Sequence, residues 1–299
     1  MRNILGWAIF LIAAVSAYGQ QPRKLKVFVS VDMEGIAGVV TSDQLSPGSF
    51  EYERFRNFMT REALAAIEGA RQAGATEFVV ADAHGSMQNL LIDQFPPDVR
   101  LVRGEPRHLS MMAGIDATFD AAMFVGYHAS TSNLNGVRAH TFSSARMTRV
   151  GLNGAAMTEG SWNAAIAGHF GVPVIFLAGD DAAIAEVRSA IGNIEAAETK
   201  KTLGFHAAET LTPEASQKLI REKAAAAIRS LASQKPYRVN GPVTVDISFK
   251  SVMPSAVAAY LTRVFTRTDS HTLRFTAKDM VEASDIVEFL MAYRIELEP

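Results

Sequence analysis

Short apolar runs alternate with longer segments of helical periodicity over most of the chain before residue 192. The segments at residues 50–73 and 157–170 repeat apolar side chains every three or four positions, which is typical of amphipathic helices. Buried strands are indicated by runs rich in Val, Ile, Phe and Ala, at residues 27–31, 77–81, 121–127 and 172–177. Strands separated by helices predict an α/β fold with a mostly parallel sheet flanked by helices.

The pattern is less regular after residue 192. Thr212 and Pro213 suit the N-cap and first position of a long Ala-rich helix, and two strands and a closing helix follow. We therefore expect an α/β lobe over residues 20–192 and a smaller C-terminal α+β lobe over residues 193–299. The second lobe has no acidic or histidine cluster at a strand end, so its expected role is assembly and substrate shaping.

Residues 1–19 have the features of an export signal. Arg2 supplies a positive start, residues 4–15 form an apolar core, and Ala17 and Gly19 make a small-x-small cleavage site. We expect export to the periplasm or the extracellular space, with retention as an N-terminal anchor as the alternative. No later stretch approaches the ~20 apolar residues of a membrane span, so no stable membrane insertion is expected after signal cleavage.

Composition narrows the chemistry that is available. The chain of 299 residues has no cysteine, which excludes disulfides, thiolate catalysis and cysteine zinc sites. Its net charge is −2 with mixed signs, so it lacks the basic surface that is typical of nucleic-acid binding. Any metal ion must therefore be held by His, Asp and Glu.

Candidate ligands stand where the predicted strands end. Asp32 and Glu34 follow the first strand two residues apart, a spacing that in a strand puts both side chains on one face. The other strand ends carry Asp82 with His84, His128, and Asp180 with Asp181. Parallel strands bring such ends to one edge, where α/β proteins bind ligands. Carboxylates with imidazoles suit zinc or another borderline divalent ion, whereas solvated acids are the alternative for Asp32 and Glu34 taken alone.

Two further residues extend this candidate site. Glu159 heads an apolar helical stripe through Trp162 and Ile166, where a carboxylate needs a partner such as a metal. An acid placed at a helix N-terminus for its dipole is the alternative. His140 lies in a polar segment that we expect to be irregular. Beside a metal it could act as a general acid/base or stabilise an oxyanion, and otherwise it would be a surface histidine.

Several motifs occur in a fixed order along the chain. They are SVDMEGIAG, the Asp-x-His ending at His84, GYHA around His128, the Gly-Val-x-x-His ending at His140, Glu159 with its helix, and VPVIFLAGDD. In this order they resemble the D-aminopeptidases of dipeptide-transport operons, a metallopeptidase family with a dinuclear zinc site. The similarity runs from about Lys26 to the C-terminus, where FTAKDMVEA also resembles the family.

The resemblance implies a role for each candidate residue. Two zinc ions per subunit would be held by five side chains: Asp32, Glu34, His84, His128 and Glu159. Asp32 would bridge the ions, and His140 would be the essential catalytic histidine. The family also forms self-compartmentalised rings, so a homo-oligomer of about ten subunits is implied.

The resulting hypothesis is a zinc-dependent aminopeptidase that hydrolyses short peptides, with N-terminal D-amino acids of the D-Ala type, through metal-bound water and His140. The substrate amine could bind a metal or an acid such as Asp180 or Asp181, although both acids are better placed to cap the next helix. One alternative is another dinuclear metallohydrolase, an amidase or a phosphoesterase, with Arg138 and Arg146 as candidate phosphate ligands. The other is a non-catalytic periplasmic peptide- or metal-binding protein, which would have no need of His140.

Overall fold

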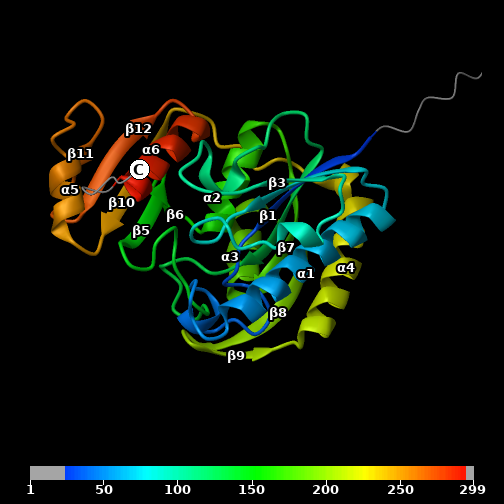
Figure 1. The fold of residues 1–299 in the computed structure, drawn as a ribbon. Coiled ribbons are helices and arrows are strands. Elements are labelled where there is room, and N and C mark those ends of the chain that lie inside the picture. Colours follow the sequence, from blue (N-terminus) through cyan, green and yellow to red (C-terminus); the bar gives the residue numbers. More distant parts are fainter. Residues whose placement is uncertain (1–23, 294–299) are drawn as a thin grey trace, which may run out of the picture.

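The computed structural model describes residues 24–293, drawn as a ribbon in Figure 1. The export signal expected at residues 1–19 lies outside the described residues and stays a prediction. No helix within residues 24–293 is both long enough and apolar enough to cross a membrane.

A seven-stranded sheet forms the centre of the molecule, in the order β3-β2-β1-β4-β7-β8-β9. Neighbouring strands from β3 to β8 pair in parallel, and only β9 runs antiparallel to its neighbour. The strands are β1 (Lys26–Val31), β2 (Glu77–Asp82), β3 (Val99–Val102), β4 (Ala121–Tyr127), β7 (Val174–Asp180), β8 (Glu195–Gly204) and β9 (Ala207–Thr210). The prediction of an α/β fold with a mostly parallel sheet is confirmed.

Helices cover both faces of this sheet because its strands are apolar on both sides. Val27, Val29 and Val31 of β1 belong to one core cluster, with residues of α1 (Tyr52–Gln72) and α4 (Pro213–Arg229). Phe28, between them, belongs to the other cluster, with residues from the opposite layer. That layer holds the helices α2 (Glu159–His169) and α3 (Asp181–Ile191). The alternation follows from the two-residue period of a strand.

A second, antiparallel sheet packs beside α2, at the left of Figure 1. Its order is β11-β12-β10-β5-β6, with the strands β5 (Met147–Leu152), β6 (Ala155–Ala156), β10 (Val243–Phe249), β11 (Thr266–Arg267) and β12 (Thr272–Ala277). The helices α5 (Val252–Ala258) and α6 (Met280–Ala292) pack on this sheet, and α6 also contacts α2. Short 3-10 turns occur at η1 (Ser42–Gln44), η2 (Ile92–Gln94), η3 (Ser110–Met112) and η4 (Leu231–Ser233).

The border between the two sheets does not fall at residue 192, where the boundary between the lobes is predicted. β8, β9 and α4 follow that residue but extend the first sheet and its helical layer. β5 and β6 precede it but pair within the second sheet. The chain therefore leaves the first sheet after β4, forms β5 and β6 of the second sheet, and returns to the first sheet at β7 before β10, β11 and β12 complete the second.

One buried carboxylate ties the helical layer to the loop after β1. Glu62 of α1 is fully buried, and its Oε1 accepts hydrogen bonds from the Ala37 N–H at 3.1 Å and the Ser216 hydroxyl of α4 at 2.8 Å. Its other carboxylate oxygen has no hydrogen-bond partner. Burial raises the pKa of Glu62 from 4.5 to about 7, although Ser216 and Ala37 lower it in part.

The raised pKa of Glu62 predicts that this residue makes the free energy of unfolding depend on pH. The folded state prefers the neutral carboxyl, so the contribution of Glu62 is most favourable below pH 4.5 and is lost as the pH rises to about 7. The free energy of unfolding should fall by about 3 kcal/mol over this range because of Glu62 alone. Glu62→Gln, which mimics the neutral form, should lack this component in urea titrations at pH 4.5 and 8. Identical pH dependence in the two proteins would contradict the assignment.

Candidate metal centre

The loop after β1 is pressed against the end of β4 at positions where only glycine fits. The Gly35 N–H donates to the Gly126 carbonyl at 2.6 Å, and a Cβ at Gly35 would lie 2.0 Å from the Tyr127 oxygen. Gly126 has a φ of +74°, and a Cβ there would lie 2.1 Å from the backbone carbonyl oxygen of Asp32. This close approach brings Asp32 and His128 together at the point where the strand order reverses, which is the usual ligand crevice of such sheets.

Asp32, Glu34 and His84 form the first group of side chains. The His84 Nδ1 lies 2.8 Å from Glu34 Oε2 and 3.4 Å from Asp32 Oδ1, and all three residues are buried. Suitable ligand atoms of these three residues lie within 4.8 Å of one another. The group has the size and the donor types of a metal site.

A second group shares Asp32 with the first. The His128 Nε2 lies 3.3 Å from Asp32 Oδ2 and 3.2 Å from Glu159 Oε2. Ligand atoms of these three residues again lie within 4.8 Å of one another. Asp32 therefore presents one carboxylate oxygen to each group, which is the geometry of a bridging carboxylate.

His140 lies beside both groups. Its ring stacks on that of His128, with centroids 4.2 Å apart, and its Nε2 is 3.9 Å from Glu34 Oε1 and 3.8 Å from Glu159 Oε1. The structure thus brings together all six residues singled out in the sequence: Asp32, Glu34, His84, His128, His140 and Glu159. They come from the ends of β1, β2 and β4, from the segment after β4, and from the first turn of α2.

Each of the three histidines is anchored by its outer ring nitrogen. The His84 Nε2 donates to the Leu45 carbonyl at 3.0 Å, and the Nδ1 atoms of His128 and His140 donate to the carbonyls of Ala129 at 3.0 Å and Arg138 at 2.8 Å. Carbonyl oxygens only accept hydrogen bonds, so these ring nitrogens carry the hydrogen. In the neutral imidazoles the inner nitrogens are therefore bare and face carboxylate oxygens.

Two buried atoms without hydrogen-bond partners show that a cation fits between these side chains. Asp32 Oδ2 and His128 Nε2 are both buried and have no hydrogen-bond partner, although they lie 3.3 Å apart. A bare nitrogen facing a carboxylate oxygen is unfavourable unless a proton or a metal ion lies between them. The donor set of nitrogens and oxygens without thiolates is one that zinc accepts.

The electrostatics of the cluster favour positive charge strongly. Burial opposes the charged imidazoles, but neighbouring carboxylates outweigh it and hold the pKa of His84 and of His128 well above the usual value. Burial would raise the pKa of Glu34, yet His84 beside it holds that pKa well below the usual value. Burial and the charge of Glu34 raise the pKa of Asp32. Protons or divalent cations can satisfy this demand, and the bridging position of Asp32 suits cations.

Local structure fixes the position of Glu159. Thr158 caps α2, with its side chain accepting from the Ser161 N–H at 2.8 Å, and Glu159 is the first helical residue. The Glu159 Oε1 accepts the Phe142 N–H at 2.6 Å, which ties the segment carrying His140 to the start of α2. Glu159 does lie in the first turn of α2, as the alternative of an acid placed for the helix dipole requires, but it is only 4% exposed and also faces His128.

The remaining acids at strand ends brace loops instead of facing the cluster. Asp82 accepts hydrogen bonds from the backbone N–H groups of Asn89 and Leu90 at 2.5 and 2.6 Å, which closes the turn that carries His84. Asp180 caps α3 and also accepts the Val137 N–H at 3.1 Å. Asp181 accepts from Thr202. The expectation that Asp180 caps the following helix is confirmed, and neither Asp180 nor Asp181 is among the residues around the cavity described below.

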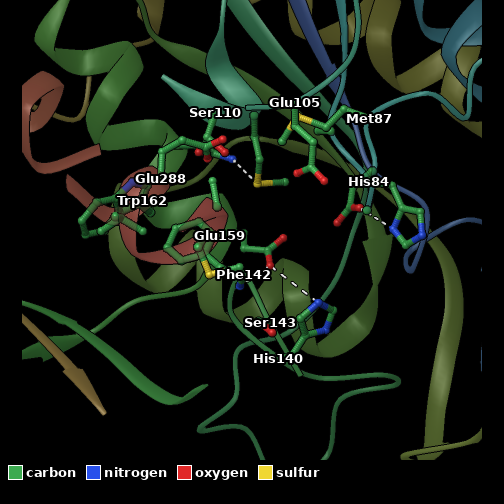
Figure 2. A pocket seen from close by; sticks show the side chains of 18 of the residues that line it. His84, Met87, Glu105, Ser110, His140, Phe142, Ser143, Glu159, Trp162 and Glu288 are labelled. Carbon is green, nitrogen blue, oxygen red and sulfur yellow. Dashed lines mark hydrogen bonds and ion pairs between the residues drawn. The ribbon is translucent and has the colours of Figure 1, made fainter. Parts of the chain in front are cut away.

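A cavity of about 690 Å³ opens onto the cluster (Figure 2). Asp32, Glu34, His84, His140 and Glu159 contribute to its lining, together with Phe142, Trp162 and residues of α6. Glu105 and Glu288 lie across the cavity from His140 in Figure 2. Among the residues that the structure describes, no lysine or arginine lines this cavity. The cavity is therefore acidic, and α6 of the second sheet supplies one of its walls.

This fold and this site define a metal-dependent hydrolase, and the comparisons with known proteins give its family. Residues 25–289 match the D-aminopeptidase family of peptidases, so the chain belongs to that family. It is 35% identical over 259 residues to a D-aminopeptidase of Bacillus subtilis (strain 168), covering 87% of this chain and 94% of the relative. It also superposes on the solved zinc-dependent D-aminopeptidase DppA from Bacillus subtilis, described as a self-compartmentalizing protease. The TM-score is 0.85 at 34% identity, covering 92% of this chain and all of the other.

Sequence reasoning missed the residues that surround the cluster. Glu105 comes three residues after β3 and Glu288 lies within α6, far away in the chain, so only the fold brings them to one cavity. Lys200 lies in a charged stretch that is typical of an exposed segment, yet it is only 2% exposed. A signal for Gly35 was present in the glycines of the DMEGIAG motif, although the reason is close packing and not a flexible turn.

The tight packing at Gly35 predicts a large effect of a single methyl group. Gly35→Ala should lower the free energy of unfolding by about 1–3 kcal/mol, because the Tyr127 carbonyl has to move away. Urea titration measures this change, and zinc content after dialysis measures its effect on the cluster. Gly151→Ala is the matched control, because its added Cβ would have ordinary contacts beginning at 3.5 Å. Equal stability of the two variants would contradict the packing argument.

Proposed function

We propose that this protein is a zinc-dependent aminopeptidase that hydrolyses short peptides with N-terminal D-amino acids. The observation that carries the proposal is the double group around Asp32, in which the inner imidazole nitrogens of His84 and His128 face buried carboxylates across 2.8–3.4 Å. Membership of the D-aminopeptidase family supports the reaction class and the stereochemistry of the substrate.

Two zinc ions per subunit would be held by the five residues of the two groups. Asp32, Glu34 and His84 would hold one, and Asp32, His128 and Glu159 the other. Zinc bound there supplies a Lewis acid for the scissile carbonyl and an activated water for its hydrolysis. The carbonyls of Leu45 and Ala129 keep the ligating nitrogens of His84 and His128 turned inward.

His140 would move protons during the reaction. Its Nδ1–H is held by the Arg138 carbonyl at 2.8 Å, so its Nε2 is the nitrogen free to exchange a proton. That Nε2 lies near Glu34 and Glu159, and His140 lines the cavity where a peptide would bind. Stacking on His128 fixes the plane of the ring. From this position it can protonate the leaving amine or stabilise the developing oxyanion.

The acidic cavity favours peptides with a free amino group. Glu105 and Glu288 add two carboxylates to a wall without lysine or arginine among the described residues. Such a wall attracts an ammonium group and repels a phosphate. Arg138 contacts His206 and Phe205, and Arg146 donates to carbonyls at the end of α6, so neither is available as a phosphate clamp in the cavity. The phosphoesterase alternative therefore loses its support, and a binding protein would not require His140.

Assembly and export complete the proposal. The proposed homo-oligomeric ring of about ten subunits is supported by the similarity to DppA, which is described as a self-compartmentalizing protease. Residues 1–19 support export to the periplasm or the extracellular space. Mass photometry of the purified chain tests the proposed assembly, since a stable monomer would contradict it.

N-terminal sequencing of exported protein tests the proposed export, since an intact Met1 would contradict signal cleavage.

The first experiment compares hydrolysis of D-Ala-D-Ala and L-Ala-L-Ala by the mature protein, with its zinc content measured before and after chelation. We expect cleavage of the D-peptide that chelation removes and zinc restores. His140→Ala should keep its zinc and lower kcat by about 10²–10⁴-fold, because only proton transfer is lost. Bound zinc with neither peptide cleaved would contradict the peptidase proposal, and absence of zinc would contradict the site.

The charge of the cavity gives a second prediction. N-acetylated D-Ala-D-Ala should be cleaved poorly or not at all, because acetylation removes the ammonium group that the acidic wall attracts. Glu105→Gln with Glu288→Gln should raise KM for the free peptide more than it changes kcat. Steady-state kinetics at several ionic strengths measure both effects. Equal cleavage of free and acetylated peptides would exclude recognition of the amine.

A further inference from the structure

Lys200 of β8 is a buried cation that is neither a candidate ligand nor a residue of the cavity. It is 2% exposed and lies next to Asp180 in the pairing of β7 with β8. Its ammonium group donates to three backbone carbonyls, those of Glu34, Ile36 at 3.0 Å and Val39 at 2.6 Å. An ammonium has three hydrogens, so its donor capacity is fully used.

All three acceptors belong to the loop after β1, residues 32–39, which we call the ligand loop. The neighbouring Thr199 adds a fourth contact from the same strand, since its hydroxyl lies 2.7 Å from the Gly35 carbonyl and 3.0 Å from the Gly179 carbonyl. Side chains of β8 therefore donate hydrogen bonds to the carbonyls of residues 34, 35, 36 and 39. Without these donors the buried carbonyls of Glu34, Gly35 and Val39 would lose their hydrogen bonds, which is unfavourable, and the Ile36 carbonyl would keep only the Val39 N–H at 3.2 Å.

Burying a lysine only to fill space in a core is energetically unfavourable. Burying an ammonium costs more than burying an apolar side chain of similar volume, unless its charge and donors are used. Here both are used, because the donors bind the ligand loop, and the carboxylates of Asp180, Glu62 and Glu34 partly offset the burial that lowers the pKa of Lys200 to about 8. The residue is thus suited to holding one backbone conformation and not only to packing.

We propose that Lys200 is a positioning residue of the metal centre, which fixes the backbone of the ligand loop so that Asp32 and Glu34 stay aimed at their histidines. This inference rests on the proposed zinc-dependent function. Lys200 acts through hydrogen bonds to the backbone of the ligand loop and touches neither substrate nor metal.

Because Lys200 is positively charged, the direction in which zinc affinity changes on its removal is informative. A positive charge near a cation site repels the cation, so removal of the ammonium would by itself strengthen zinc binding. Loss of outer hydrogen bonds that orient metal ligands typically weakens metal affinity by about 10- to 100-fold. A weaker affinity after removal of the charge therefore cannot come from electrostatics, and a control variant separates lost positioning from a general loss of stability.

The test is zinc affinity of the full mature chain, measured by competition with a chromophoric chelator. Lys200→Met keeps the length of the side chain and removes its charge and donors. We expect about 10- to 100-fold weaker zinc binding than in the wild type, with faster amide hydrogen exchange in residues 33–39. Leu273→Ala is the control, because it removes fully buried apolar volume in the second sheet, away from the ligand loop. It should lower thermal stability without changing zinc affinity.

Each outcome decides between positioning and mere stability. Equal or tighter zinc binding by Lys200→Met would overturn the inference, as would equal losses of zinc affinity in Lys200→Met and Leu273→Ala. If Lys200→Met does not fold, Thr199→Val, which removes the hydroxyl that contacts the carbonyls of Gly35 and Gly179, is measured by the same criterion and should show a smaller loss. A wild-type chain that binds no zinc would remove the proposed function, whereas zinc binding that is unaffected by either variant would remove the positioning role alone.

Discussion

The structure depends on a contact between groups that all accept hydrogen bonds. In their neutral forms His84, His128 and His140 each give their one N–H hydrogen to a backbone carbonyl, so their other nitrogens face the carboxylates of Asp32, Glu34 and Glu159. Three buried carboxylates that face three bare nitrogens are costly unless positive charge enters between them. Protons would supply it in part, but the shared carboxylate of Asp32 favours two cations. The family's reaction follows from this demand for positive charge.

The rest of the molecule holds that cluster in place. Gly35 and Gly126 let the ends of β1 and β4 approach more closely than any side chain would allow, so that Asp32 reaches His128. Lys200 and Glu62 then engage the ligand loop from β8 and α1, on elements separated by more than a hundred residues. The second sheet contributes α6 to the cavity. Close packing at two glycines and hydrogen bonds from two further elements thus hold the backbone that carries Asp32 and Glu34.

Much of this could be predicted from the sequence, for identifiable reasons. Buried parallel strands are continuous apolar runs, and each of the five candidate ligands closely follows one of them or heads an apolar helix, whereas His140 was singled out in the irregular polar segment after β4. Other features have no local signal. Asp82 and Asp180 also follow strands, but only the fold shows that their partners are backbone N–H groups. β8 was not predicted because its sequence, EAAETKKTLG, is charged, and the burial of Lys200 depends on carbonyls far away in the chain. The pairing of β5 with β10 likewise joins segments that sequence order separates.

The central claim is that Asp32 lies between two cations, and anomalous diffraction at the zinc edge from zinc-loaded crystals tests it most directly. The account predicts two peaks about 3.5–4 Å apart, the spacing of two-metal hydrolases, one beside His84 and the other beside His128, with the Asp32 carboxylate between them. A single peak, or peaks that leave Asp32 uncoordinated, would contradict it.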